Sequence, residues 1–197
     1  MKNNDNTFRQ TNGFAMQYGV LLGFCGLAGL ACFVGSFNSP FLSFFHLLFT
    51  LGSPVLAGYF TIKFRNAVMQ PELGFTFGRG FGFTFLMGMY ATLWIAVGLF
   101  VYLAYFDNGY IFDAYEKMLT QPEYVAQLRA SGTWDVIQSM GGITKLVNNM
   151  RAISAGNYAT GVIYMSLMVA PIISGFIALI SRKAPAGWSM PNVTNEK

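Results

Sequence analysis

Three long stretches of the sequence, 10–62, 80–106 and 152–181, contain no Asp, Glu, Lys or Arg. Charged side chains are costly in hydrocarbon, and a helix needs about 20 apolar residues to cross a bilayer core of about 30 Å. Soluble domains carry roughly 25% charged residues, whereas this 197-residue chain has 10% charged and 54% hydrophobic residues. The pattern predicts a multi-pass membrane protein and argues against a soluble enzyme.

The first charge-free stretch is long enough for two crossings. It divides at Ser36-Phe37-Asn38-Ser39-Pro40, a turn sequence in which Pro40 suits the start of a helix. We therefore expect one all-α membrane domain over residues 1–197, with four transmembrane helices. Their predicted positions are 13–35, 41–62, 80–106 and 158–180.

The distribution of basic residues predicts the orientation. The side that holds both termini and the loop between the second and third helices carries an excess of Lys and Arg, whereas the opposite side carries slightly more acids than bases. Because basic excess marks the cytoplasmic face, both termini are expected in the cytoplasm and segment 107–157 outside. The basic residues form no stripe or recognition motif, so nucleic acid is not an expected partner.

The extracytoplasmic segment 107–157 is expected to form short helices. Pro122 and Glu123 suit the first turn of one helix, and Thr133 suits the cap of another that ends at Gly141. A final apolar stripe comprises Ile143, Leu146, Val147, Met150 and Ile153. We favour a lid on the outer end of the bundle, and the alternatives are a docking face and an interfacial membrane helix.

Small residues recur every four positions in the third span. They are Gly80, Thr84, Gly88, Thr92 and Ala96. Similar positions in the first and fourth spans are Gly19, Gly23, Ala170, Ser174 and Ala178. Such ridges let neighbouring backbones approach closely, so they predict a compact helix bundle and reveal nothing about a substrate.

His46 is the only histidine and lies within the second predicted span. An ionisable residue inside a membrane is a functional-site hypothesis. No carboxylate lies in any predicted span to serve as a proton-relay partner, and two cysteines alone could not complete a metal site. We therefore favour a neutral histidine hydrogen-bonded to Thr50 or to a backbone carbonyl.

Cys25 and Cys32 lie seven positions apart in one span, about 10 Å along a helix, which exceeds the ~7 Å reach of a disulfide. They are expected to be inert buried thiols. Asp107 and Arg151 flank the third and fourth spans, where they either form an ion pair at the rim or are separately solvated.

Pro54 and Pro171 fall inside predicted spans, and each removes a helical hydrogen bond. The resulting kinks could serve gating. Ser53 and Ser174 lie nearby and could satisfy the freed backbone groups locally, which is the simpler interpretation.

The sequence contains no phosphate-binding G-x-x-x-x-G-K loop, no H-E-x-x-H motif and no Cys-x-x-Cys pair. We assign no catalytic, cofactor-binding or metal-binding residue.

The order of motifs resembles a known family. Leu73-Gly74-Phe75-Thr76-Phe77-Gly78 enters the third span, Tyr105-Phe106-Asp107 leaves it, and Pro122-Glu123 begins a helix of the outer segment. This pattern resembles the bacterial domain-of-unknown-function family 4199, four-helix inner-membrane proteins of Gram-negative bacteria. The resemblance implies the four-helix architecture and a bacterial inner membrane. It implies no functional residue, because the family has no established activity.

We therefore expect a non-enzymatic scaffold or accessory subunit without a cofactor. Its expected partners are the lipid bilayer and other membrane proteins or a second copy. The alternatives are a small permease or channel and a role in lipid or lipid-linked sugar metabolism. A polar groove across the bundle would favour transport, and a dry interior with an apolar outer patch would favour scaffolding.

Overall fold

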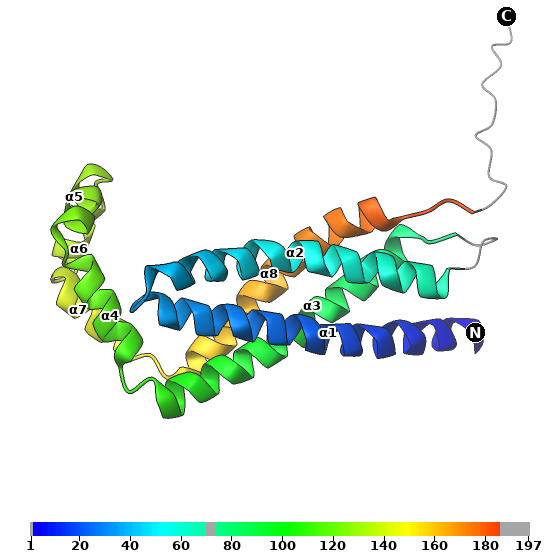
Figure 1. The fold of residues 1–197 in the computed structure, drawn as a ribbon, viewed down its shortest axis with the longest axis horizontal. Coiled ribbons are helices and arrows are strands. Elements are labelled where there is room, and N and C mark those ends of the chain that lie inside the picture. The colour runs from blue at the N-terminus through cyan, green and yellow to red at the C-terminus, as the bar shows by residue number, and fades with distance from the viewer. Residues whose placement is uncertain (1, 70–73, 186–197) are drawn as a thin grey trace, which may run out of the picture.

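The computed structural model describes residues 2–69 and 74–185, with side chains from residue 7 onward. Four long helices form a bundle, and a cluster of short helices lies beyond one end of it (Figure 1). The long helices are α1 (Lys2–Ser36), α2 (Pro40–Val68), α3 (Phe77–Val101) and α8 (Ala155–Ser181). The all-α prediction is confirmed.

Each long helix is long and apolar enough to cross a membrane. The candidate spans are Thr7–Ser36, Pro40–Val68, Phe77–Phe106 and Ala155–Ser181. The third includes a π-helical turn, η1 (Tyr102–Phe106), that continues α3. All four predicted spans are therefore confirmed as helices.

The helices extend beyond the charge-free stretches. The second span was predicted to end at residue 62, but α2 continues through Lys63 and Arg65 to Val68. Arg65 Nη1 donates to the carbonyl oxygen of Ser181 at 3.1 Å, so this basic turn of α2 is attached to the end of α8. A charge-free stretch indicates which residues can lie in the hydrocarbon core of the bilayer. It does not mark where a helix ends, because the backbone hydrogen bonds of the helix continue into the charged residues.

The turn between α1 and α2 forms as predicted. The backbone N–H groups of Asn38 and Ser39 both donate to the carbonyl of Gly35, and Pro40 occupies the first turn of α2. Leu73, from the motif at the entry to the third span, lies outside the described residues.

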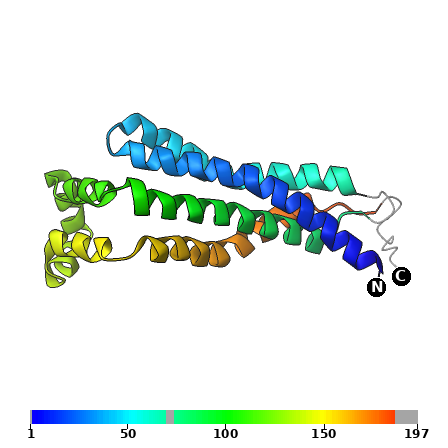
Figure 2. The same cartoon turned by 90° about the horizontal axis from the view of Figure 1, so that it is seen from below.

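The bundle is unevenly packed. The principal interfaces are α1 with α3, α3 with α8 and α1 with α2, whereas α2 makes much smaller contacts with α3 and α8. Figure 2 shows α3 between the α1–α2 hairpin and α8 over most of the bundle. We call the end at which α1 begins and α8 ends the terminal end, and the opposite end the arm end.

The core near the terminal end is aromatic. Phe64 and Phe83 stack with their ring centroids 4.1 Å apart, and both side chains are fully buried. Tyr18 stacks on Phe60 beside them at 4.8 Å. Next to this aromatic cluster, the hydroxyls of Thr61 and Thr84 share a buried hydrogen bond of 2.8 Å that joins α2 to α3.

Four short helices form the arm. They are α4 (Tyr110–Leu119), α5 (Pro122–Ala130), α6 (Thr133–Ser139) and α7 (Gly142–Arg151). The arm has an apolar core of its own, made by Leu119, Ile137, Ile143 and Val147.

This arrangement corrects the lid expected for the final apolar stripe. Ile143 and Val147 are buried inside the arm rather than against the end of the bundle, and the arm projects beyond that end (Figure 1). The stripe needed an apolar surface, and the neighbouring short helices of the same segment supply it.

One predicted helix cap in the arm is wrong. Pro122 begins α5 as expected, but the residue that caps α6 is Gly132, with φ of 72°, and Thr133 is the first helical residue. The Thr133 hydroxyl instead shares a hydrogen bond with Ser131 at 2.9 Å. Glycine adopts positive φ without strain, so the sharp reversal between α5 and α6 places the cap one residue earlier.

Candidate functional site

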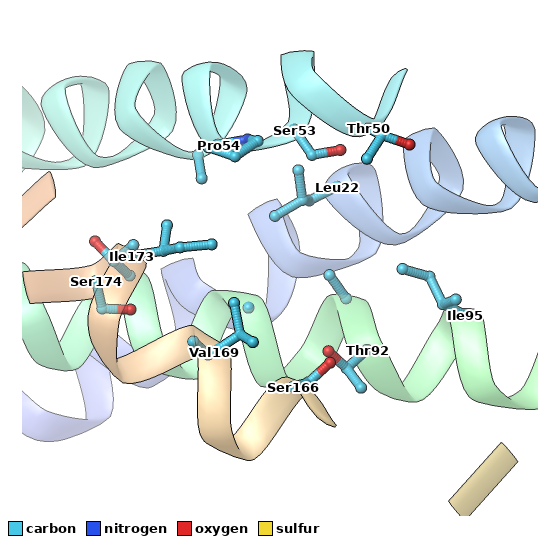
Figure 3. Close-up of a pocket in the computed structure, with 15 residues that line it drawn as sticks. Leu22, Thr50, Ser53, Pro54, Thr92, Ile95, Ser166, Val169, Ile173 and Ser174 are labelled. Atoms are coloured by element: carbon cyan, nitrogen blue, oxygen red, sulfur yellow. The ribbon is translucent and has the colours of Figure 1, made fainter. Parts of the chain in front are cut away.

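A cavity of about 260 Å³ lies inside the bundle, at positions where all four long helices contribute residues (Figure 3). We call it the central cavity. Its lining comprises Leu22, Thr50, Ser53, Pro54, Ala57, Thr84, Gly88, Ala91, Thr92, Ile95, Ser166, Val169, Ala170, Ile173 and Ser174. The lining includes no charged residue and combines apolar groups with six hydroxyls.

The central cavity is partly open, and its opening lies between α2 and α8. The lining residues that remain solvent-exposed are Thr50 and Pro54 of α2 and Val169 of α8. Because α2 and α8 have little mutual contact, the opening faces sideways, where lipid would surround the helices.

Small residues account for both the tight and the loose parts of the bundle. A Cβ atom added at Gly19 would collide with Tyr90 and with the carbonyl of Met87, so α1 and α3 are in close backbone contact there. A Cβ added at Gly88 would meet only the Cβ of Ala170, at 4.0 Å. The predicted small-residue ridge on α3 therefore has two roles. At Gly80 it packs closely against α8, and at Gly88 it lines the central cavity.

Four hydroxyls of the lining are unpaired. Thr50, Thr92, Ser166 and Ser174 make no side-chain hydrogen bond to any described residue. Thr92 is 6% exposed and Ser174 is 2% exposed, and both side chains line the central cavity. No local sequence pattern marks this set, because its members come from three helices that only the fold brings together.

Pro54 of α2 lines the central cavity, and Pro171 of α8 directly follows the lining residue Ala170. The expected local satisfaction of the freed carbonyls by serines is not found. Ser53 donates to the carbonyl of Phe49 at 2.6 Å, not to the carbonyl of Thr50 that Pro54 frees. Ser174 makes no side-chain hydrogen bond within the described part of the chain.

The central cavity is closed toward the terminal end. The stacked rings of Phe64 and Phe83 and the Thr61–Thr84 hydrogen bond fill the bundle there. Arg79 covers the face of Phe64, with its guanidinium carbon 5.7 Å from the ring centroid. No polar groove across the bundle is therefore found among the described residues.

A second hollow, the arm cleft, separates the arm from the α1–α2 turn. Its volume is about 710 Å³, and Asp113 and Lys117 contribute charge to its lining. The rings of Phe37 and Tyr110 meet edge to face at 6.4 Å along it. The Tyr110 hydroxyl is buried and has no hydrogen-bond partner among the described residues.

The proposed ion pair between Asp107 and Arg151 is absent. Asp107 is 3% exposed and accepts hydrogen bonds from the backbone N–H groups of Gly109 at 3.1 Å and Ile111 at 3.0 Å. Arg151 instead pairs with Asp113 at 2.6 Å. Asp107 follows the π-helical turn and caps the start of α4, so its carboxylate is used locally.

The expected contact of His46 with a backbone carbonyl is present. Its Nδ1 lies 3.0 Å from the carbonyl oxygen of Gly29, and its ring packs against Phe33 with centroids 5.2 Å apart. Cys25 and Cys32 are free thiols, as expected, but both are half-buried and not buried as predicted. No group of three or more potential metal ligands occurs among the described residues.

Comparison with known proteins connects this architecture to one family. A family model described as "Protein of unknown function (DUF4199)" matches residues 12–183, which include all four spans and the arm. No curated protein and no solved structure shows significant similarity to the chain. The chain, a multi-pass membrane protein, therefore belongs to the DUF4199 family, whose function is unknown.

Proposed function

We propose that this protein is a non-enzymatic accessory subunit that recruits another membrane protein through its arm. One observation carries the proposal: the arm buries its own apolar residues in a separate core and projects beyond the bundle (Figure 1). A segment that only covered the bundle would bury its stripe against the bundle. An arm with an independent core leaves its outer surface available to a partner.

The arm offers a small apolar patch for such contact. Val136 and Met140 lie one turn apart at α6, with exposed fractions of 56% and 44%. Apolar side chains exposed on the lipid-facing bundle are unremarkable, but the arm projects beyond the hydrophobic spans. Apolar groups exposed there favour binding to another protein.

We further propose a bacterial inner membrane location, with the terminal end in the cytoplasm and the arm outside. The basic excess at the terminal end supports this orientation: Lys63, Arg65, Arg79, Arg182 and Lys183 flank the spans there.

Removing the arm tests the accessory role. Asp107 and Ala155 line one small pocket, so the ends of α3 and α8 are close enough for a short linker to replace 110–151. We expect the shortened protein to insert normally and to keep a thermal unfolding midpoint within a few degrees of wild type. It should lose the partner that photo-crosslinking from Val136 identifies in cells carrying the full chain.

Point variants supply the matched control. Val136→Glu should weaken the same crosslinked complex at least tenfold, since a charge would enter an apolar contact. Gln138→Glu places the same charge at an exposed position on another face of α6 and should leave the complex intact. Retention of the complex in the arm-deleted protein would refute the proposal.

The small permease remains a second candidate, because the central cavity contains unpaired hydroxyls at membrane depth. Transport would require the aromatic cluster to open toward the terminal end. A transport assay of reconstituted vesicles, with Phe83→Ala as a widened variant, would detect such a path.

A further inference from the structure

Most serine and threonine side chains in the spans are bonded to their own helix. The hydroxyls of Thr11, Ser36, Ser53, Thr61, Thr84, Thr160 and Ser181 donate to a carbonyl three or four residues earlier. This local bond is the usual way in which a serine or threonine satisfies its donor inside a membrane helix.

The hydroxyls that lack this bond are concentrated at one place. Thr50, Thr92, Ser166 and Ser174 have no side-chain hydrogen bond in the described part of the chain, and all four line the central cavity. The other serine or threonine without such a bond in the described spans, Ser43, lies in the first turns of α2 near the arm end and is exposed. Unpaired serine and threonine hydroxyls thus mark the cavity.

Leaving these groups unpaired has a free-energy cost. The hydroxyl oxygens of Thr92 and Ser174 face the open space of the central cavity and are not enclosed by protein atoms. Where hydrocarbon, not water, fills that space, a donor without a partner loses its hydration and gains nothing in return. Thr92 and Ser174 are both more than nine-tenths buried, with 6% and 2% exposed. A bound molecule with hydrogen-bonding oxygens would remove this cost.

We propose that the central cavity binds the head of an uncharged lipophilic molecule that carries carbonyl or hydroxyl oxygens. The lining contains no charged residue, which excludes a charged head by desolvation. A volume of about 260 Å³ equals that of about nine water molecules, at roughly 30 Å³ each, and so suits a small head. The hydroxyls of α2, α3 and α8 would donate to its oxygens.

The apolar tail of the ligand has a path beside α8. A shallow groove of about 630 Å³ runs along this helix from Ile153 and Tyr158 toward the middle of the span. It shares Ser166 and Val169 with the central cavity, so the two hollows adjoin. A molecule entering sideways from the bilayer would keep its tail in the groove and place its head between α2 and α8.

This proposal is independent of the accessory role, because the central cavity and the arm surface share no lining residue. The test uses the full chain purified in detergent and two probes of similar size, decylbenzoquinone and decylbenzene. Binding is measured by native mass spectrometry and by the probe-dependent rise in unfolding temperature. The carbonyl probe should bind about tenfold more tightly, because only it accepts hydrogen bonds.

Two glycines of α3 provide a matched pair of variants. Gly88→Leu would extend a side chain into the central cavity and should abolish binding, whereas Gly82→Leu adds the same side chain where nothing lies within 4 Å. Gly82→Leu should bind as wild type does. Thr92→Val keeps the shape of the side chain and removes one hydroxyl. It should weaken binding of the carbonyl probe about fivefold and leave binding of decylbenzene unchanged.

Three outcomes would overturn the proposal. The first is no binding of the carbonyl probe, and the second is equal binding of decylbenzene, which would reduce the site to an apolar gap. The third is unchanged binding in a folded Gly88→Leu protein, which would place the probe elsewhere on the bundle.

Discussion

Among single residues, glycines have the most divergent roles in this bundle. Gly19 and Gly23 face the backbone and side chains of α3 so closely that a Cβ at either position would collide with Tyr90 or Trp94. Gly88, in contrast, faces open space in the central cavity. Glycines at similar spacing therefore allow two backbones to approach closely in one interface and leave an open cavity in another. The outcome depends on where the partner helix lies.

This difference yields a stability prediction. Gly19→Ala should lower the free energy of unfolding by about 1–3 kcal/mol, because the new methyl group must displace the carbonyl of Met87 and the Cβ of Tyr90. Gly82→Ala is the control, since a Cβ there meets nothing within 4 Å. Thermal or denaturant unfolding in mild detergent measures both, and equal changes would contradict close packing at Gly19.

Among the elements, the arm and the bundle are separate packing units. The arm core of Leu119, Ile137, Ile143 and Val147 shares no residue with the aromatic cluster of the bundle. At their connection, Asp107 accepts hydrogen bonds from the backbone N–H groups of Gly109 and Ile111 and so caps the start of α4. The arm should therefore unfold without the bundle when its core alone is disturbed.

The variant Val147→Asp tests this separation. Val147 is fully buried in the arm, and a carboxylate there costs several kcal/mol, which a core of four buried residues cannot offset. Hydrogen exchange should become fast throughout α4–α7 and stay slow in α1 and α3. The neighbouring Asn148→Asp, at an exposed position, should change nothing. Loss of protection in the bundle would show that the two units are coupled.

At the scale of the whole molecule, the two ends differ in charge. The terminal end has the basic residues of the span borders, and the arm has acids and bases in near balance. Basic residues beside membrane spans are concentrated on the cytoplasmic side, so this distribution supports the proposed orientation with the terminal end in the cytoplasm.

Cysteine labelling checks this orientation. In a Cys25→Ala, Cys32→Ala background, Gln127→Cys in the arm should react with a membrane-impermeant maleimide in spheroplasts. Asn66→Cys, at the terminal end of α2, should react only after the membrane is permeabilised. Both positions are exposed in the fold, so accessibility differs only through topology. The reverse labelling pattern would invert the proposed orientation.

The sequence by itself determined the four spans, their order and the turn before Pro40. These features follow from local properties, because exclusion of charge from hydrocarbon and the helical period act along the chain. The observed ends of the helices differ from the predicted ends. The second span was predicted to end before Lys63, but α2 continues past Arg65, whose guanidinium donates to the carbonyl oxygen of Ser181.

Only the tertiary structure decided what the small and polar residues do. Asp107 and Arg151 have compatible charges, yet each is closer to another partner, the α4 backbone and Asp113 respectively. Thr92 and Ser174 look like ordinary ridge residues until α3 and α8 meet beside a splayed α2. Contacts between distant segments depend on how the helices cross, and no local pattern of residues encodes that geometry.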